Sequence, residues 1–240
     1  METVKLVDWT PDPIGIMYWA WQNMHNPIDP NGPSMPIDEK TKKHFLKVVA
    51  KIPHQSVLEY VKLTFYINGS RAFQQQLTRS RKSVFSIQSL RIVNAGAFAE
   101  EKNYHTQPEA DIPEYHEAML AIQKMYNELT KVMPVEAARG ILPLNINSPI
   151  TWSVDLRELV HILELRFCNN AQHEFRIVAS KIKQLVAEKI DPDIAAILFR
   201  PHCQQFGYCN SPAPCHLVTE KNGYQNIVPT RNIDKLGLKS

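Results

Sequence analysis

The chain has 240 residues, 44% of them hydrophobic, with 27 Lys and Arg against 24 Asp and Glu and a formal net charge of +3. That length and apolar content are enough for a substantial core, and we expect residues 1–240 to form a single domain. The nearly balanced charge excludes binding of nucleic acid through bulk positive charge, and no apolar run is long enough for a membrane span. We therefore expect a cytoplasmic protein without a nucleic-acid or membrane partner.

The N-terminal third is expected to contain an arm, two helices and a strand. Six prolines fall in residues 1–36, and because proline removes a backbone donor we predict a loop-rich arm with one short helix. Residues 38–51 predict a helix that Pro53 ends. Alternating apolar and polar side chains predict a strand over residues 57–67, and residues 70–78 predict a short helix after it.

The remainder of the chain is predominantly helical in its pattern. Residues 92–99 fit either a strand or a loop. Apolar residues at the helical period predict a long helix over 113–132, and Asp155 is a suitable N-cap for a helix over 155–168. Other expected elements are a short helix at 134–140, an extended piece at 151–154, a helix at 171–190 and a last turn or two at 193–199. The pattern predicts an α+β fold, with a mixed, mostly antiparallel sheet flanked by helices.

A basic segment is the most informative part of the sequence. Residues 60–99 contain no Asp or Glu, but they carry Lys62, Arg71, Arg79, Arg81, Lys82 and Arg91 among several Ser, Thr and Gln residues. Arg presents a planar set of donors that matches phosphate oxygens, so the segment predicts an anion site. One alternative is a solvated cationic face. Another is single-stranded nucleic acid, which the small number of aromatic stacking partners disfavours.

The centre of this segment resembles the signature of the flavin-dependent thymidylate synthases. That signature is Arg-His-Arg, seven further residues and Ser, with another Arg two positions on. Arg79, Arg81, Ser89 and Arg91 are in register with it, whereas Ser80 stands where the family has His. Three further blocks occur in the family's order: His54–Glu59, Ala138–Asn145, and a last block made of Trp152–Arg157, Leu165–Arg166 and Ala171–Glu174. The resemblance covers roughly residues 37–200.

The resemblance implies an enzyme that methylates C5 of dUMP to give dTMP. FAD, NADPH and methylenetetrahydrofolate would take part, in a homotetramer whose active sites are shared between subunits. The dUMP positions are Gln76, Leu77, Thr78, Arg79, Ile87, Gln88, Ser89, Leu90, Arg91, Arg139 and Arg166. Arg166 would be the catalytic residue, because a cation there stabilises negative charge on the pyrimidine. The alternative for Arg166 is an ordinary helix-end ion pair with Glu164 or Glu174.

The resemblance also places FAD. Its positions are His54, Ser56, Arg79, Ser80, Arg81, Ile87, Asp155, Leu156, Arg157 and His161. Arg157 and His161 are one helical turn apart and share a face, and the absence of a G-x-G-x-x-G turn means that side chains and loops would hold the cofactor. Departures from the family pattern, such as Ser80 for His and Ile87 for Glu, fall mainly on the flavin side. Two alternatives therefore stay open, namely a relative that makes another C5-modified nucleotide, for example a hydroxymethylated one, and a binding homologue without turnover.

A Cys/His segment lies in the C-terminal extension, residues 201–240, outside the resemblance. Cys203, Cys209, Cys215 and His216 are ligand types that bind zinc. The C-x-x-C pair that is usual in such sites is missing, which favours free or packed thiols and no metal. Cys168 is expected to be a packed helix residue.

Overall fold

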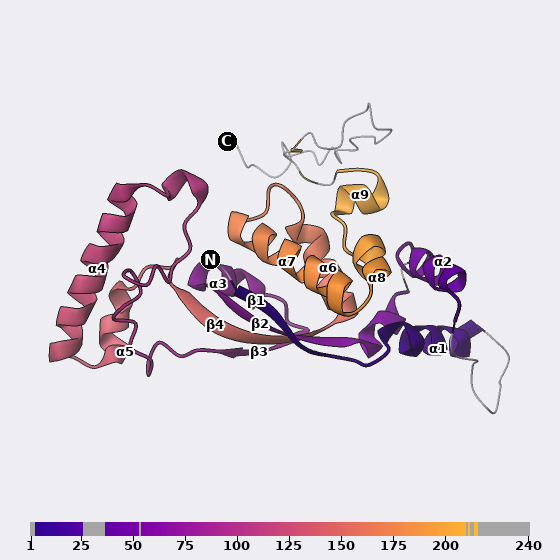
Figure 1. Cartoon of the computed structure of the whole chain (residues 1–240), viewed down its shortest axis with the longest axis horizontal. Coiled ribbons are helices and arrows are strands. Elements are labelled where there is room, and N and C mark those ends of the chain that lie inside the picture. Colours follow the sequence, from indigo (N-terminus) through magenta and orange to yellow (C-terminus); the bar gives the residue numbers. More distant parts are fainter. Residues whose placement is uncertain (1–2, 26–36, 53, 210, 212–213, 216–240) are drawn as a thin grey trace, which may run out of the picture.

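The computed structural model describes residues 3–25, 37–52, 54–209, 211 and 214–215. Its centre is a four-stranded sheet in the order β1-β2-β4-β3, in which every pairing is antiparallel (Figure 1). The strands are β1 Thr3–Trp9, β2 Lys62–Ser70, β3 Ser83–Ile87 and β4 Asn147–Asp155. The α+β architecture expected from the sequence is confirmed.

The two central strands show why this sequence forms a sheet with a packed face. Alternate residues of β2 are buried, and Phe65 pairs in register with Trp152 of β4, with ring centroids 5.6 Å apart. Both side chains are 0% exposed. Because side chains alternate across a strand, this pattern commits one face of the sheet to the core.

Helices cover that face and both ends of the sheet (Figure 1). They are α1 Pro13–His25, α2 Glu39–Val49, α3 Arg71–Leu77, α4 Pro113–Val132, α5 Val135–Ala138, α6 Leu156–Arg166, α7 His173–Lys189, α8 Pro192–Leu198 and α9 His202–Phe206, with short 3-10 turns at Ser56–Tyr60, Pro108–Ala110 and Arg139–Ile141. The largest is α4, which stands at one end of the sheet beside α5, away from α6 and α7. Within the described part of the chain, none of these helices is long and apolar enough to cross a bilayer.

A partly buried ion-pair cluster joins two of the helices. The Nζ atom of Lys42 on α2 lies 2.9 Å from Glu39, 3.0 Å from Asp191 and 3.2 Å from Asp193, at the start of α8. The Lys42 side chain is only 12% exposed. Burial alone would lower the pKa of this amine, but the three carboxylates outweigh it and hold the pKa of Lys42 well above its usual value. The cluster therefore stabilises the docking of α2 on α8 while Lys42 is charged.

Two sequence predictions need correction. The N-terminal arm is not loop-rich over residues 3–25, because β1 pairs with β2 and α1 buries Ile14, Met17 and Ala20. Pro13 stands at the first position of α1, where proline is tolerated because that N–H has no helical partner. The strand predicted over 57–67 begins instead at Lys62, since residues 56–60 form a 3-10 turn.

The basic segment contains a strand that the sequence analysis missed. β3 runs along the edge of the sheet from Ser83 to Ile87, and only one of its five side chains contributes to the main core, through partial burial of Phe85. Residues 92–99, left open between strand and loop, form turns, and the extended piece predicted at 151–154 is part of the nine-residue strand β4. Pro53, predicted to end α2, lies outside the described residues.

Candidate functional site

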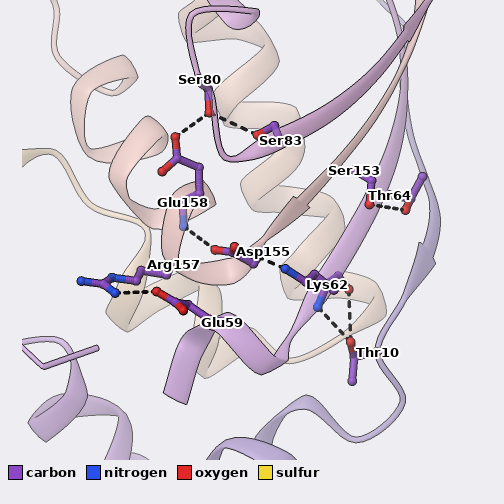
Figure 2. Close-up of polar contacts among 10 residues, drawn as sticks. All are labelled: Thr10, Glu59, Lys62, Thr64, Ser80, Ser83, Ser153, Asp155, Arg157 and Glu158. Atoms are coloured by element: carbon purple, nitrogen blue, oxygen red, sulfur yellow. Dashed lines mark hydrogen bonds and ion pairs between the residues drawn. The ribbon is translucent and has the colours of Figure 1, made fainter. Parts of the chain in front are cut away.

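The first turn of α6 is fixed by Asp155, as the sequence predicts. Its carboxylate accepts a hydrogen bond of 2.8 Å from the backbone N–H of Glu158, and Lys62 Nζ lies 3.3 Å from its other oxygen (Figure 2). Capping at this position satisfies a helix donor that otherwise has no partner. It also ties α6 to β2 and β4, so the side chains that α6 projects have a defined position.

A cavity of about 390 Å³ opens beside α6. It brings together Asp155, Arg157 and His161, three of the positions predicted for FAD. Gln55, Lys82, Glu158, Val160, Glu164, Gln205 and Phe206 complete its lining. The volume is within the range of small-molecule sites, and the wall combines cationic, polar and aromatic groups. We call it the larger cavity, in comparison with the smaller cavity of about 170 Å³ that shares part of its wall.

Other predicted FAD residues lie outside this lining. Ser56 lines a separate cavity, of about 430 Å³, together with Glu59. Glu59 forms an ion pair of 2.5 Å with Arg157, which connects this separate cavity to the larger cavity (Figure 2). His54 and Arg81 are exposed. Leu156 is 1% exposed and belongs to the core, so its side chain is committed to packing.

A smaller cavity, of about 170 Å³, lies next to the larger one, and α6 contributes side chains to both. It joins the end of α3 to α6 and α7, and it contains Gln76, Leu77, Arg79 and Arg166 from the predicted dUMP set. Ser80, predicted to contact flavin, also lines this smaller cavity. Thr78 caps α3 instead, with its hydroxyl donating to the Gln74 carbonyl at 2.9 Å.

Two side chains border both cavities. Glu158 and His161 lie in the lining of each, so they form a shared wall. The Ser80 hydroxyl donates to Glu158 Oε1 at 2.5 Å and lies 3.1 Å from the Ser83 hydroxyl (Figure 2). Sequence reasoning missed Glu158, because an acid three residues after an N-cap is normally a capping residue. Its true partner comes from the turn before β3.

Among the residues that the structure describes, no carboxylate is paired with Arg166. Its guanidinium lies 4.6 Å from the centre of the Phe175 ring, and burial lowers its pKa from the usual value. The two acids proposed as alternative partners are engaged elsewhere, since Glu164 binds His202 and Glu174 binds Ser70. Arg166 therefore presents its positive charge to the smaller cavity, where a buried charge acts strongly on a ligand.

The rest of the predicted dUMP set lies beyond the other end of β3. Arg91 pairs with Glu136 at 2.8 Å, and its N–H donates to the Ser89 hydroxyl at 3.3 Å. Arg139 follows Glu136 by three residues, at the end of α5. Ile87 is 36% exposed, Gln88 donates its N–H to the Pro149 carbonyl at 2.9 Å, and Leu90 is 8% exposed in a small second core. Because β3 alone spans about 13 Å, one chain does not unite this group with Arg79 and Arg166.

The cysteines gather near α9. Burial raises the pKa of the Cys203 thiol, and the neighbouring thiols of Cys209, Cys215 and Cys168 raise it further. Across the described residues, no group of three or more His, Cys, Asp or Glu side chains is arranged to hold a metal ion. His216 lies outside the described residues, so the alternative of a zinc site that includes it stays open.

The sequence as a whole settles the family. The profile of the family described as thymidylate synthase complementing protein matches residues 5–192. The chain belongs to this family. A flavin-dependent thymidylate synthase from Thermococcus onnurineus is 32% identical over 221 residues, covering 86% of this chain and 88% of that protein. One from Pyrococcus abyssi is 32% identical over 223 residues, covering 87% and 89%.

A solved structure supports the fold. The UMP/dUMP methylase PolB from Streptomyces cacaoi, bound with 5-Br dUMP, superimposes with a TM-score of 0.66 at 20% identity, covering 82% of this chain and 94% of that one. The family and the fold implied by the sequence motifs are thus confirmed. The roles of individual residues remain predictions, and they are developed below.

Proposed function

We propose that this chain is a flavin-dependent thymidylate synthase that works in the cytoplasm, converting dUMP to dTMP with methylenetetrahydrofolate as one-carbon donor and NADPH as reductant. The observation that carries the proposal is the pair of adjoining cavities with Glu158 and His161 as their shared wall. A redox cofactor and a pyrimidine must lie next to each other for transfer between them, and this arrangement provides two neighbouring sites of different character.

The larger cavity suits FAD by its donors and its ring surface. Arg157, Lys82 and His161 supply cationic or donor groups for a pyrophosphate, and Gln55 supplies an amide. Phe206 adds an aromatic face. Bound there, FAD would supply the hydride chemistry that reduction of the one-carbon unit requires. The protein's part is to hold the cofactor and exclude water.

The smaller cavity suits the pyrimidine nucleotide. Arg166 places a partly desolvated cation on its wall, and negative charge that develops on the uracil ring as C5 becomes nucleophilic is stabilised most strongly by such a preorganised charge. Gln76 and Arg79 provide further donors from the end of α3. The role proposed for Arg166 is therefore catalytic, and that of Arg79 is binding.

A homotetramer with shared sites would complete the nucleotide pocket. Ser89, Arg91 and Arg139 are predicted to bind dUMP but lie beyond the far end of β3 from Arg79. A neighbouring copy could place this group opposite the smaller cavity of the first copy. Two exposed apolar side chains, Val84 on β3 at 71% and Ile92 in the turns beyond it at 83%, favour burial of this region by another chain.

The test combines spectroscopy with product analysis. Purified protein supplied with FAD should show bound oxidised flavin, and with dUMP, methylenetetrahydrofolate and NADPH it should yield dTMP, identified by mass. A product carrying an extra oxygen would replace this proposal with the hydroxymethylating alternative. Flavin binding without any product would indicate a binding homologue. Absence of flavin binding would overturn the proposal altogether.

A further inference from the structure

Helix α9 lies beyond the residues 5–192 that match the family, yet it borders the larger cavity. The chain turns at Pro201 after α8, forms α9 over residues 202–206 and ends it at Gly207, whose φ of 79° is in the left-handed region (Figure 1). Glycine adopts that conformation readily, and its N–H closes the helix on the Cys203 carbonyl at 3.0 Å. The sequence therefore builds a short, well-terminated helix at this place.

One side-chain contact attaches α9 to α6, and a second joins the chain after α9 to the turn after α6. The ring of His202 hydrogen-bonds to the Glu164 carboxylate, and both side chains are largely buried, at 17% and 18% exposure. Beyond the helix, the Asn170 amide donates to the Ser211 hydroxyl at 3.2 Å. The His202 ring also packs against Phe206, with centroids 4.7 Å apart. These contacts fix the position of Phe206 relative to the cavity.

Phe206 is an unusual residue for a polar cavity wall. Its side chain is 47% exposed, although Arg157, His161 and Glu164 line the same space. An exposed phenyl ring on a concave surface leaves apolar area in water, and a planar ring laid against it would bury that area with favourable stacking geometry. Gln205 stands next to it in the lining and offers both a donor and an acceptor for a ring edge.

We propose that α9 is the outer wall of the flavin site and that Phe206 stacks on a planar ring of the bound cofactor. Gln205 contacts the edge of the same ring, and His202 and Glu164 are positioning residues that hold α9 in place. The inference rests on the proposed function for the identity of the cofactor. Both ends of FAD are planar heteroaromatic rings, so the contact is with either the isoalloxazine or the adenine.

The experiment titrates the cofactor-free, full-length protein with FAD and with FMN, which lacks the adenine. The variants are Phe206→Ala, Phe206→Leu, which keeps apolar bulk without a flat face, and Phe206→Tyr, which keeps the ring. We expect Phe206→Ala to weaken FAD binding about tenfold, Phe206→Leu to weaken it less, and Phe206→Tyr to stay within about twofold of the unsubstituted protein. Affinity for dUMP should be unchanged in all three.

Two comparisons identify the ring. Equal weakening of FAD and FMN binding, with brighter fluorescence of the bound flavin in Phe206→Leu than in Phe206→Tyr, would place Phe206 on the isoalloxazine, because a stacked aromatic ring quenches flavin emission. Weakening of FAD alone would place it on the adenine. Either result supports the proposal.

The result that overturns the inference is distinct from failure of the proposed function. If the unsubstituted protein binds FAD and all three variants bind it equally well, Phe206 does not contact the cofactor. If Phe206→Ala instead changes the oligomeric state in light scattering and leaves FAD affinity unchanged, the ring belongs to a contact between copies. If the unsubstituted protein binds no FAD, the proposed function itself is wrong.

Discussion

Replacement of Glu174 should loosen the element that delivers Gln76 and Arg79 to the smaller cavity. Glu174 is 0% exposed and accepts hydrogen bonds from the Ser70 N–H at 2.6 Å and from the Ser70 hydroxyl. The same hydroxyl accepts the N–H of Phe73 at 3.0 Å and so caps α3. Hydrogen bonds to a charged group contribute about 1.5–3 kcal/mol each, and Glu174→Ala would leave two buried donors unsatisfied. We expect it to lower the free energy of unfolding by about 3–5 kcal/mol.

Glu174→Gln removes the carboxylate but keeps the size of the side chain, and so distinguishes the two contributions to the free energy of unfolding. The amide keeps one acceptor oxygen at similar volume, so we expect a loss of only about 1–3 kcal/mol. Glu188, exposed near the end of the same helix α7, is the matched control, and Glu188→Gln should lie within about 0.5 kcal/mol of the unsubstituted protein. Urea unfolding at one fixed protein concentration gives these values. The reasoning is refuted if Glu174→Ala unfolds at the same urea concentration as Glu188→Gln.

Four further substitutions test the remaining assignments. Arg166→Ala should reduce turnover far more than dUMP affinity and Arg91→Ala mainly the affinity, and equal affinity losses with unchanged saturated turnover would contradict this division. Ser80→His should leave the dUMP dissociation constant within about threefold. Ser80→His should change flavin affinity or the rate of NADPH-driven reduction in stopped flow, because the new imidazole would contact the Glu158 carboxylate. Unchanged flavin behaviour together with a large loss of dUMP affinity would instead assign Ser80 to the nucleotide site. Lys42→Met should lower the unfolding free energy by about 1–3 kcal/mol at neutral pH. The pKa of Lys42 is raised in the folded state, so its contribution is complete below the unfolded pKa of about 10.4 and is lost as the pH rises from there through the higher pKa of the folded protein. The gap between the thermal melts of the two proteins should therefore narrow as the pH rises above about 10.4. A constant gap over that range would refute the ion-pair explanation.

Local signals in the sequence predicted the elements whose stability is local or strongly periodic. The helix α4 follows from apolar residues at the helical period, and the start of α6 follows from Asp155. The edge strand β3 was missed for a physical reason. Its side chains are mostly exposed, so core packing does not require alternating apolar residues in this strand. Its hydrogen bonds to β4 are backbone contacts, which side-chain patterns do not record.

The prediction of a loop-rich N-terminal arm was wrong for a different reason. Its prolines indicated loops, but Pro11 falls in the short turn between β1 and α1, and Pro13 is the first residue of α1, a position that proline favours. What makes β1 a strand is its partner β2, more than fifty residues away. No local pattern carries that information.

The site shows the same division between local and tertiary information. Motif register selected Gln76, Arg79 and Arg166, which the structure gathers in one cavity. It could not reveal that Glu158 separates this cavity from the larger one, because its contact with Ser80 joins residues 78 positions apart. Nor could it reveal α9, whose attachment through Glu164 joins residues 38 positions apart.

The motif from Arg79 to Arg91 is continuous in sequence but is divided in space by β3. Its first arginine borders the smaller cavity, and its last is paired with Glu136 beyond the opposite end of the strand. Because a stiff strand separates the two groups of predicted binding residues, both groups of one chain cannot contact the same small molecule. In an oligomer the same stiffness fixes the distance between the two groups, so that one copy could contribute residues to two separate nucleotide sites. If Arg91 binds dUMP as we propose, a nucleotide phosphate presented by a neighbouring copy would replace the exposed ion pair of Arg91 with Glu136 by a stronger charge-assisted pair.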